Sequence, residues 1–213
     1  RTLEDNAALR GKLAALGLGE RKFFTFTTPD GVQLNGFMVL PAGFSPSRQY
    51  PVVMHQYSGP GSQQVVDSWS AGNMGGCLYE QYLAQEGFIS VCVDGRGTGG
   101  RGRDFEQCTY LKLYYDSIYT ERFMQTPGEN GPGYDVCPIS RASRLSGKLL
   151  LIHGLADDNV HFRGAAEYTE ALVQADKDFR ELTYTNRNHS IYGGNTRYHL
   201  FRQITQHFKE MQK

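Results

Sequence analysis

The sequence has no excess of charge of either sign and no long hydrophobic run. Its 213 residues carry 22 basic and 22 acidic side chains, and this balance, without a block of Lys and Arg, argues against nucleic acid or an anionic membrane as a partner. No run of about 18 apolar residues occurs, so we expect no membrane span. The chain opens at Arg1 without a basic and then apolar leader, so we expect no signal peptide in it.

The sequence also lacks the cysteine spacings of a metal site. The cysteines form no C-x-x-C pair and no ligand pattern with the six histidines, so we expect no zinc or other metal. Four cysteines allow three complete disulfide pairings or none, and the pattern leaves these alternatives open. They are Cys77, Cys92, Cys108 and Cys137.

The order of the hydrophobic patterns predicts an α/β fold. Alternating apolar residues on both sides of Pro29-Asp30-Gly31 predict a β-hairpin. Continuous apolar runs, separated by helical patterns, follow at 51–57, 88–94 and 148–153, with a further strand at 181–184, and are typical of buried parallel strands. We expect one domain over residues 1–213, with a mostly parallel sheet that is flanked by helices.

Candidate functional residues follow three of these strands. Ligands of open α/β sheets bind outside the carboxyl ends of the strands. Asp157 and His189 follow neighbouring strands and are expected to meet as an acid and base of the kind that acyl transfer needs. Singly, they also fit a helix cap and a turn histidine. Tyr57 ends the run at 51–57 and either donates a hydrogen bond to an oxyanion or is an ordinary aromatic at a strand edge.

Two further motifs have a structural and a functional interpretation. Gly95-x-Gly97-x-x-Gly100 matches the dinucleotide-binding fingerprint formally, but a polar turn follows it where that site needs a helix. We therefore expect a structural loop and not a nucleotide-dependent oxidoreductase. Tyr115 and Tyr119 lie four residues apart, so on a helix they share one face and either wall an apolar pocket for a flat ring such as proline or pack in the core.

A nucleophile is missing from this arrangement. The α/β-hydrolases carry their serine in a G-x-S-x-G turn, and no such motif occurs in the chain. Ser58 and Ser62 lie in a Gly-Pro loop and are poor candidates. The 54 residues between Asp94 and Leu149 contain no buried strand, where about two βα units of some 30 residues are expected. The sequence thus predicts an α/β-hydrolase fold without its central nucleophile strand–helix unit, with a discontinuity near 113/114.

Several long motifs resemble the prolyl oligopeptidase family of serine peptidases, over nearly the whole chain. The motifs are TTPDGVQLNGFMVLPAGF, YPVVMHQYSGPGSQQV, DGRGTGGRGRDFEQCTYLKL, YYDSIYTERFM, LLLIHGLADDNVHF and YTNRNHSIYGGNTRYH. The resemblance implies a serine exopeptidase that releases N-terminal dipeptides, with Asp157 as the triad acid, His189 as the base and Tyr57 as an oxyanion donor. It further implies substrate-binding residues at Tyr115, Tyr119, Asn159 and Val160.

The same resemblance implies the partners and the setting. The expected substrates are peptides with Pro or Ala in second position, no cofactor is needed, and the protein forms a homodimer in a secreted or periplasmic location. The β-propeller that precedes the hydrolase domain in this family has no counterpart in the sequence. Because the serine is also missing, the alternative is a catalytically inactive relative or fragment that acts as a binding or interaction module.

Overall fold

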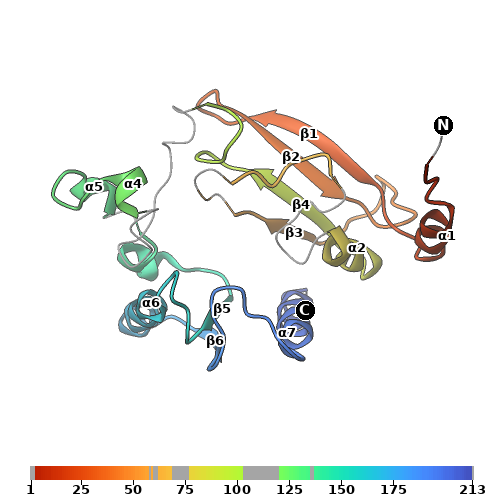
Figure 1. Cartoon of the computed structure of the whole chain (residues 1–213). Coiled ribbons are helices and arrows are strands. Elements are labelled where there is room, and N and C mark those ends of the chain that lie inside the picture. Colours follow the sequence, from red (N-terminus) through yellow and green to blue (C-terminus); the bar gives the residue numbers. More distant parts are fainter. Residues whose placement is uncertain are drawn as a thin grey trace. The chain divides into compact units, whose positions relative to one another are not determined.

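The computed structural model describes residues 3–57, 59, 62–68, 77–102, 120–134 and 137–212. The chain forms two compact units, Arg1–Glu106 and Gln107–Lys213, and each contains a sheet (Figure 1). The expected discontinuity at 113/114, and with it Tyr115 and Tyr119, lies outside the described residues.

The first unit contains a four-stranded sheet with the order β1-β2-β4-β3. Its strands are β1 (Arg21–Thr27), β2 (Gln33–Val39), β3 (Val52–His55) and β4 (Ile89–Asp94). Only β3 and β4 pair in parallel, whereas β2 is antiparallel to both β1 and β4. The expectation of a mostly parallel sheet is wrong for this unit, because the second strand of the hairpin inserts beside β4.

The hairpin forms where turn chemistry predicted it. The amide of Thr28 donates to the Val32 carbonyl at 2.8 Å, and the amide of Gly31 donates to the Thr28 carbonyl at 2.9 Å. Gly31 has a φ of 84°, a conformation that costs glycine little because it has no Cβ. The turn therefore sets the register in which Thr27 pairs with Gln33.

A small hydrophobic core lies between this sheet and the helix α2 (Cys77–Gln85). Phe37 and Val39 of β2 and Cys92 of β4 are fully buried with Ala84 of α2, and Val65 packs against them. A second helix, α1 (Ala7–Ala15), precedes the sheet and has no buried residue. The buried cluster thus fixes the face of the sheet that α2 covers.

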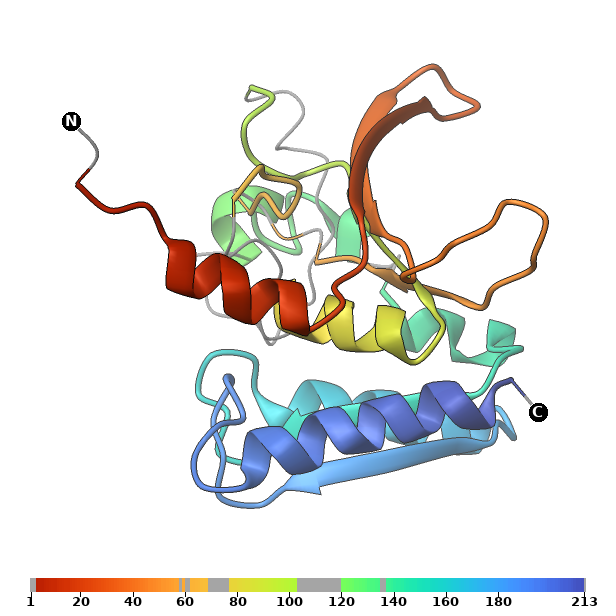
Figure 2. The same ribbon diagram turned by 90° about the vertical axis from the view of Figure 1, so that its right-hand side faces the viewer.

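The second unit contains two parallel strands, β5 (Leu149–Gly154) and β6 (Phe179–Tyr184). Helix α6 (Phe162–Gln174) connects them, and helix α7 (Thr196–Glu210) follows β6. The two helices lie on opposite faces of the strand pair (Figures 1 and 2). Shorter helices precede β5, namely α4 (Thr120–Met124), α5 (Gly131–Tyr134) and the 3₁₀ helix η1 (Ile139–Arg144).

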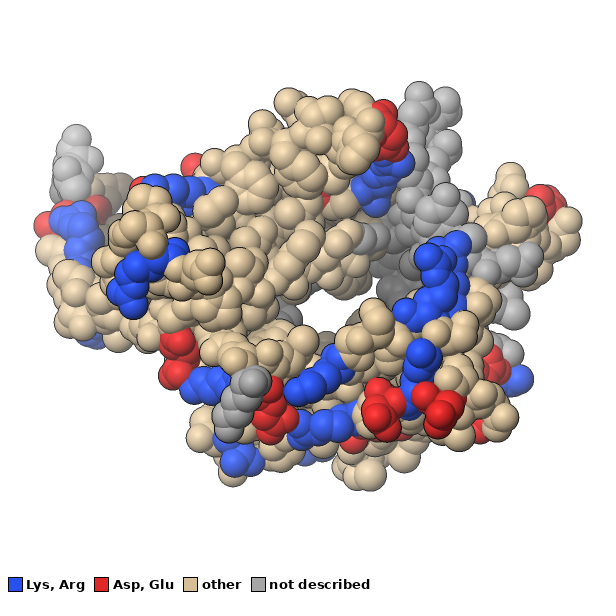
Figure 3. All heavy atoms as spheres, turned by 180° about the vertical axis from the view of Figure 1, so that it is seen from behind, with Lys and Arg blue, Asp and Glu red and all other residues tan. Residues whose placement is uncertain are grey.

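Charged side chains of both signs are interspersed on the face of the described residues that Figure 3 shows. Within the described ranges, no helix combines the length and the apolar character that crossing a membrane requires.

Candidate active site

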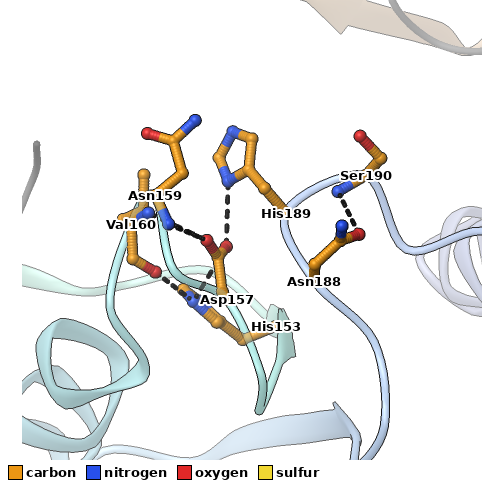
Figure 4. A network of polar contacts seen from close by, with 7 residues as sticks. All are labelled: His153, Asp157, Asn159, Val160, Asn188, His189 and Ser190. Carbon is orange, nitrogen blue, oxygen red and sulfur yellow. Dashed lines mark hydrogen bonds and ion pairs between the residues drawn. The ribbon is translucent and has the colours of Figure 1, made fainter.

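Asp157 and His189 form a hydrogen-bonded pair at the carboxyl ends of β5 and β6. Asp157 lies three residues beyond the end of β5, and His189 lies in the loop between β6 and α7. The Nδ1 atom of His189 is 2.9 Å from Oδ2 of Asp157 (Figure 4). The structure thus brings together the acid and the base that the strand order placed at neighbouring strand ends.

The backbone around Gly154 holds the two loops together. The amide of Leu155 donates to the Tyr184 carbonyl at 3.0 Å, and the amide of Ala156 donates to the Arg187 carbonyl at 3.1 Å. A Cβ atom at position 154 would lie 2.3 Å from the Arg187 carbonyl oxygen and 2.6 Å from that of Asn188. Only glycine allows this close approach, which carries the His189 loop up to Asp157.

The Asp157 carboxylate is buried and fully engaged. Its Oδ1 accepts hydrogen bonds from the amides of Asn159 and Val160, both at 2.9 Å, while Oδ2 faces His189. Burial alone raises the pKa of Asp157, but the hydrogen bond from His189 and those from Val160 and Asn159 outweigh burial, and the net pKa lies below its ordinary value. Asp157 is therefore held as a carboxylate.

His189 is oriented by this carboxylate. An ionised carboxylate only accepts hydrogen bonds, so the Nδ1 atom of His189 carries the proton and donates it to Asp157. The Nε2 atom points away from Asp157 (Figure 4), and the side chain is 41% exposed. Neutral His189 thus presents its unprotonated nitrogen away from Asp157, as a general base requires.

The turn after His189 contains an unusual backbone conformation. The amide of Ile191 donates to the Asn188 carbonyl at 3.1 Å, and Ile191 has a φ of 45°. A β-branched residue in this region is strained, and such strain persists only where the surroundings enforce it.

His153 is a second histidine beside Asp157, and the strand pattern did not reveal this contact. Its Nε2 atom is 2.8 Å from the Val160 carbonyl oxygen and 3.4 Å from Oδ2 of Asp157. In the sequence it is one more residue of the apolar run at 148–153, and only its spacing of four residues from Asp157 hints at a contact. His153 of β5 is therefore linked by polar groups to Asp157 and Val160 of the turn that follows it.

The other candidate residues lie in different places. Asn159 and Val160 belong to the Asp157 turn, and Oδ1 of Asn159 is buried without a hydrogen-bond partner among the described residues. Tyr57 belongs to the first unit, two residues beyond β3, and is 47% exposed. Tyr115 and Tyr119 lie outside the described ranges.

The glycine loop after β4 is tied down by its own polar groups. The carboxylate of Asp94 accepts the amides of Gln64 and Val65 at 2.9 and 3.0 Å. The amide of Gly99 donates to the Ser62 carbonyl at 3.1 Å. Up to residue 102, where the described part of this loop ends, no helix of the kind that a dinucleotide site requires begins, and the described part has the character of a structural loop.

The remaining serine and cysteine candidates have structural surroundings where they are described. Ser58 lies outside the described residues, and the Ser62 hydroxyl accepts a hydrogen bond from the side-chain Nε2 of Gln64 at 3.2 Å. Cys92 is a free thiol, and burial, with nearby Asp94, raises the pKa of Cys92 to about 12. Among the described residues no group of three or more His, Cys, Asp and Glu side chains is arranged to hold a metal ion.

Comparisons with known proteins agree on one family. The model of the prolyl oligopeptidase family matches residues 107–213. A probable dipeptidyl peptidase 4 of Emericella nidulans is 29% identical over 97% of this chain and 35% of its own length. One from Aspergillus fumigatus is 29% identical over the whole chain and 36% of its own length.

A solved structure shares both the sequence and the fold. The crystal structure of Porphyromonas gingivalis dipeptidyl peptidase 4 is 38% identical, with a TM-score of 0.88 over 99% of this chain and 38% of that protein. The chain spans about a third of the length of these relatives. It belongs to the prolyl oligopeptidase (S9) family of serine hydrolases, and it resembles the catalytic domain of dipeptidyl peptidase 4.

Proposed function

We propose that this chain is part of the hydrolase domain of a serine exopeptidase that releases N-terminal dipeptides with Pro or Ala in second position. The observation that carries the proposal is the 2.9 Å hydrogen bond between Asp157 and His189 in a chain whose relatives are dipeptidyl peptidases. In this mechanism His189 takes the proton of the nucleophilic serine through Nε2 and later returns it to the leaving amine. Asp157 keeps the imidazole in the tautomer that makes this possible.

The other site residues act on the substrate. The hydroxyl of Tyr57 donates to the oxygen of the tetrahedral intermediate, beside a backbone amide that follows the serine. Tyr115, Tyr119 and Val160 line the pocket for the second residue of the peptide. Asn159 holds the substrate backbone. Its buried Oδ1, which has no partner among the described residues, supports this role, since such an oxygen is costly unless a donor reaches it.

We further propose that the serine belongs to a segment that this sequence lacks between Leu113 and Tyr114. No G-x-S-x-G motif occurs in the 213 residues. The match to the Aspergillus fumigatus relative extends over 286 aligned positions and includes the whole chain, so at least 73 positions of that alignment have no residue here. A length of this order accommodates two βα units of about 30 residues each.

The strand edges support the same proposal. β3 ends the four-stranded sheet, and its Val52 and Met54 are 60% and 58% exposed. β5 pairs only with β6 within the described residues, and its apolar residues from Leu149 to Ile152 are only half-buried. Apolar strands with an open edge are unusual in a finished α/β fold, because both faces and both edges are normally covered. We infer that strands of the absent segment pair with β3 and with β5.

The test compares the protein purified from its source with the 213-residue chain made alone. We expect the source protein to exceed 24 kDa, to hydrolyse a proline dipeptide amide and to be labelled on a serine by a fluorophosphonate. We expect the 213-residue chain to lack labelling and to melt without cooperativity, since unpaired strand edges leave backbone groups without partners. A soluble, cooperatively melting source protein of about 24 kDa would overturn the proposal of an absent segment.

The absence of a G-x-S-x-G serine from this chain also favours a second candidate function, that of a binding module without catalytic activity. A source protein that contains no fluorophosphonate-reactive serine and does not turn over the proline substrate, yet binds the peptide, would establish this candidate and exclude the peptidase.

The oxyanion role of Tyr57 is tested in the active protein. Tyr57→Phe removes the donor and keeps the ring, so we expect kcat to fall by a factor equivalent to about 2–4 kcal/mol with little change in KM. Tyr50→Phe is the matched control, because the hydroxyl of Tyr50 accepts the Ser45 amide at 3.1 Å in a different loop. An undiminished kcat in the Tyr57 variant would remove this residue from the oxyanion site.

A further inference from the structure

We propose that His153 is a positioning residue, which holds the Asp157 turn in the geometry that His189 requires. The proposal rests on the proposed function in so far as Asp157 and His189 act as acid and base. It adds a residue whose polar contacts lie behind the Asp157–His189 pair and which has no contact with the solvent-facing Nε2 atom of His189 (Figure 4).

The His153 ring occupies one defined position. It belongs to β5, the side chain is only 14% exposed, and its ring lies edge-on to Phe162 at a centroid distance of 5.7 Å. Its Nε2 atom lies 2.8 Å from the carbonyl oxygen of Val160. A carbonyl oxygen only accepts, so Nε2 of His153 carries a proton and donates it.

This hydrogen bond fixes Val160 from a second side. The amide of Val160 donates to Oδ1 of Asp157, while its carbonyl oxygen accepts from His153. The peptide groups on both sides of Val160 are therefore held, the N–H by the Asp157 carboxylate and the carbonyl by the His153 imidazole. Loss of the imidazole donor would leave a part-buried carbonyl without its partner and let the turn relax.

The same N–H group also approaches the carboxylate. Nε2 of His153 is 3.4 Å from Oδ2 of Asp157, the oxygen that accepts from His189. Oδ2 thus lies between two imidazole rings, and rotation of the carboxylate away from His189 would disturb both. His153 limits this rotation on the Oδ2 side, as the amides of Asn159 and Val160 do on the Oδ1 side. Catalytic groups tolerate displacements of only about 1 Å before the rate falls about 100-fold.

Two substitutions separate positioning from plain packing. His153→Phe keeps an aromatic ring against Phe162 and removes the N–H donor. His153→Gln removes the ring and keeps an N–H donor near the place of Nε2. A residue that only packs tolerates Phe better than Gln, whereas a residue that positions Asp157 through its N–H tolerates Gln better than Phe.

The first readout is the Nδ1 proton of His189 in the protein that carries this chain. A proton held between His189 and Asp157 gives a low-field NMR signal that is absent when the hydrogen bond opens and the proton exchanges with water. We expect the signal in the wild type and in His153→Gln, and its loss in His153→Phe. Persistence of an unchanged signal in His153→Phe, or its loss in both variants with unchanged melting temperatures, would overturn the proposal.

The second readout is the rate of hydrolysis of a proline dipeptide amide. We expect kcat to fall about 10- to 100-fold in His153→Phe and to recover in His153→Gln. We expect KM to change little, because His153 does not reach the substrate side.

The peptidase proposal and the His153 proposal fail in distinguishable ways. A wild type that shows the low-field signal without turnover contradicts the peptidase function, while the effect of the two variants on the signal still decides the role of His153.

Discussion

Nδ1 of His189 donates to Oδ2 of Asp157 across a sequence separation of 32 residues. Neither residue could reach the other without the parallel pairing of β5 and β6, which brings the loops after both strands to the same edge. The hydrogen bond is thus a property of the strand pair, and its chemical consequence is a fixed imidazole tautomer.

Asp157→Asn tests the tautomer directly. The amide that replaces the carboxylate can present its own N–H to Nδ1 of His189, which stabilises the wrong tautomer, so we expect kcat to fall about 10⁴-fold in the active protein. The matched control is Asp158→Asn, because Asp158 is the exposed neighbour of Asp157. Equal rates for the two variants would contradict the assignment of Asp157 as the acid.

The low pKa of Asp157 predicts a loss of stability in acid. The ordinary pKa is 3.8 and the folded value is lower, so the unfolded chain takes up a proton first as the pH falls. The stabilising contribution is therefore complete above about pH 4 and disappears as the pH falls through the folded pKa. Other carboxylates with lowered pKa values, such as Asp30, add to the acid loss in every variant. Urea unfolding at a series of pH values should therefore show a larger loss in the wild type than in Asp157→Asn, whereas Asp158→Asn should follow the wild type.

Glu80 predicts a pH dependence of the opposite sign in the first unit. Its side chain is buried, neither carboxyl oxygen accepts a hydrogen bond from a described residue, and the Arg21 guanidinium is 3.7 Å away. Burial raises the pKa of Glu80 from 4.5 to about 7, with Arg21 opposing the shift. The folded state thus keeps a proton that the unfolded chain loses, and stability falls as the pH rises from about 4.5 to about 7.

Glu80→Gln should remove this pH dependence. We expect the free energy of unfolding of the wild type, relative to the variant, to fall by an amount of order 3 kcal/mol across that interval. Glu20→Gln is the control, because the Glu20 side chain forms an exposed ion pair with Lys22 at 3.1 Å and such pairs contribute little. A wild-type curve parallel to that of Glu80→Gln at all pH values would show that Glu80 ionises normally.

Gly154→Ala tests the close approach of the two loops. The added Cβ would meet the Arg187 and Asn188 carbonyl oxygens at 2.3 and 2.6 Å, so the loop must move, and we expect a loss of about 1–3 kcal/mol in stability. Because the same loop carries His189, activity should fall with it.

The control for this substitution is Gly164→Ala in α6. A Cβ there meets nothing within 4 Å, and alanine in a helix interior is favoured over glycine by up to about 1 kcal/mol. Thermal melts that ranked Gly154→Ala at or above Gly164→Ala would rule out the steric account.

The strands were predictable because their apolar runs are continuous. Residues 88–94 and 148–153 correspond to β4 and β5 within one residue at each end, and the hairpin followed from its turn residues. Strand pairing was less predictable. The apolar pattern of β2 fits a strand in many sheets, and the pattern says nothing of the antiparallel pairing in which Phe37 lies opposite Cys92.

In the candidate site, too, the placement of residues at strand ends was predictable, and their detailed contacts were not. The strand order was enough to bring Asp157 and His189 together, since parallel strands align their carboxyl ends. The contacts of His153 could not be read from the sequence, because they depend on the path of the turn that returns the Val160 carbonyl to the ring. The constraint at Gly154 depends in the same way on a loop that is more than 30 residues away in the sequence.

The loop contacts at Gly154 have a consequence for the order of folding. The contacts described above that join Asp157 to His189 all lie within residues 153–189, inside the second unit. Several of them close separations of about 30 residues, so they form together with the parallel pairing of β5 and β6. We therefore expect the acid and base to dock as the second unit folds, with no need for the residue that they serve. In a nascent chain the segment proposed between Leu113 and Tyr114 would be synthesised first, and the acid–base pair would complete the site once residues 153–189 follow it.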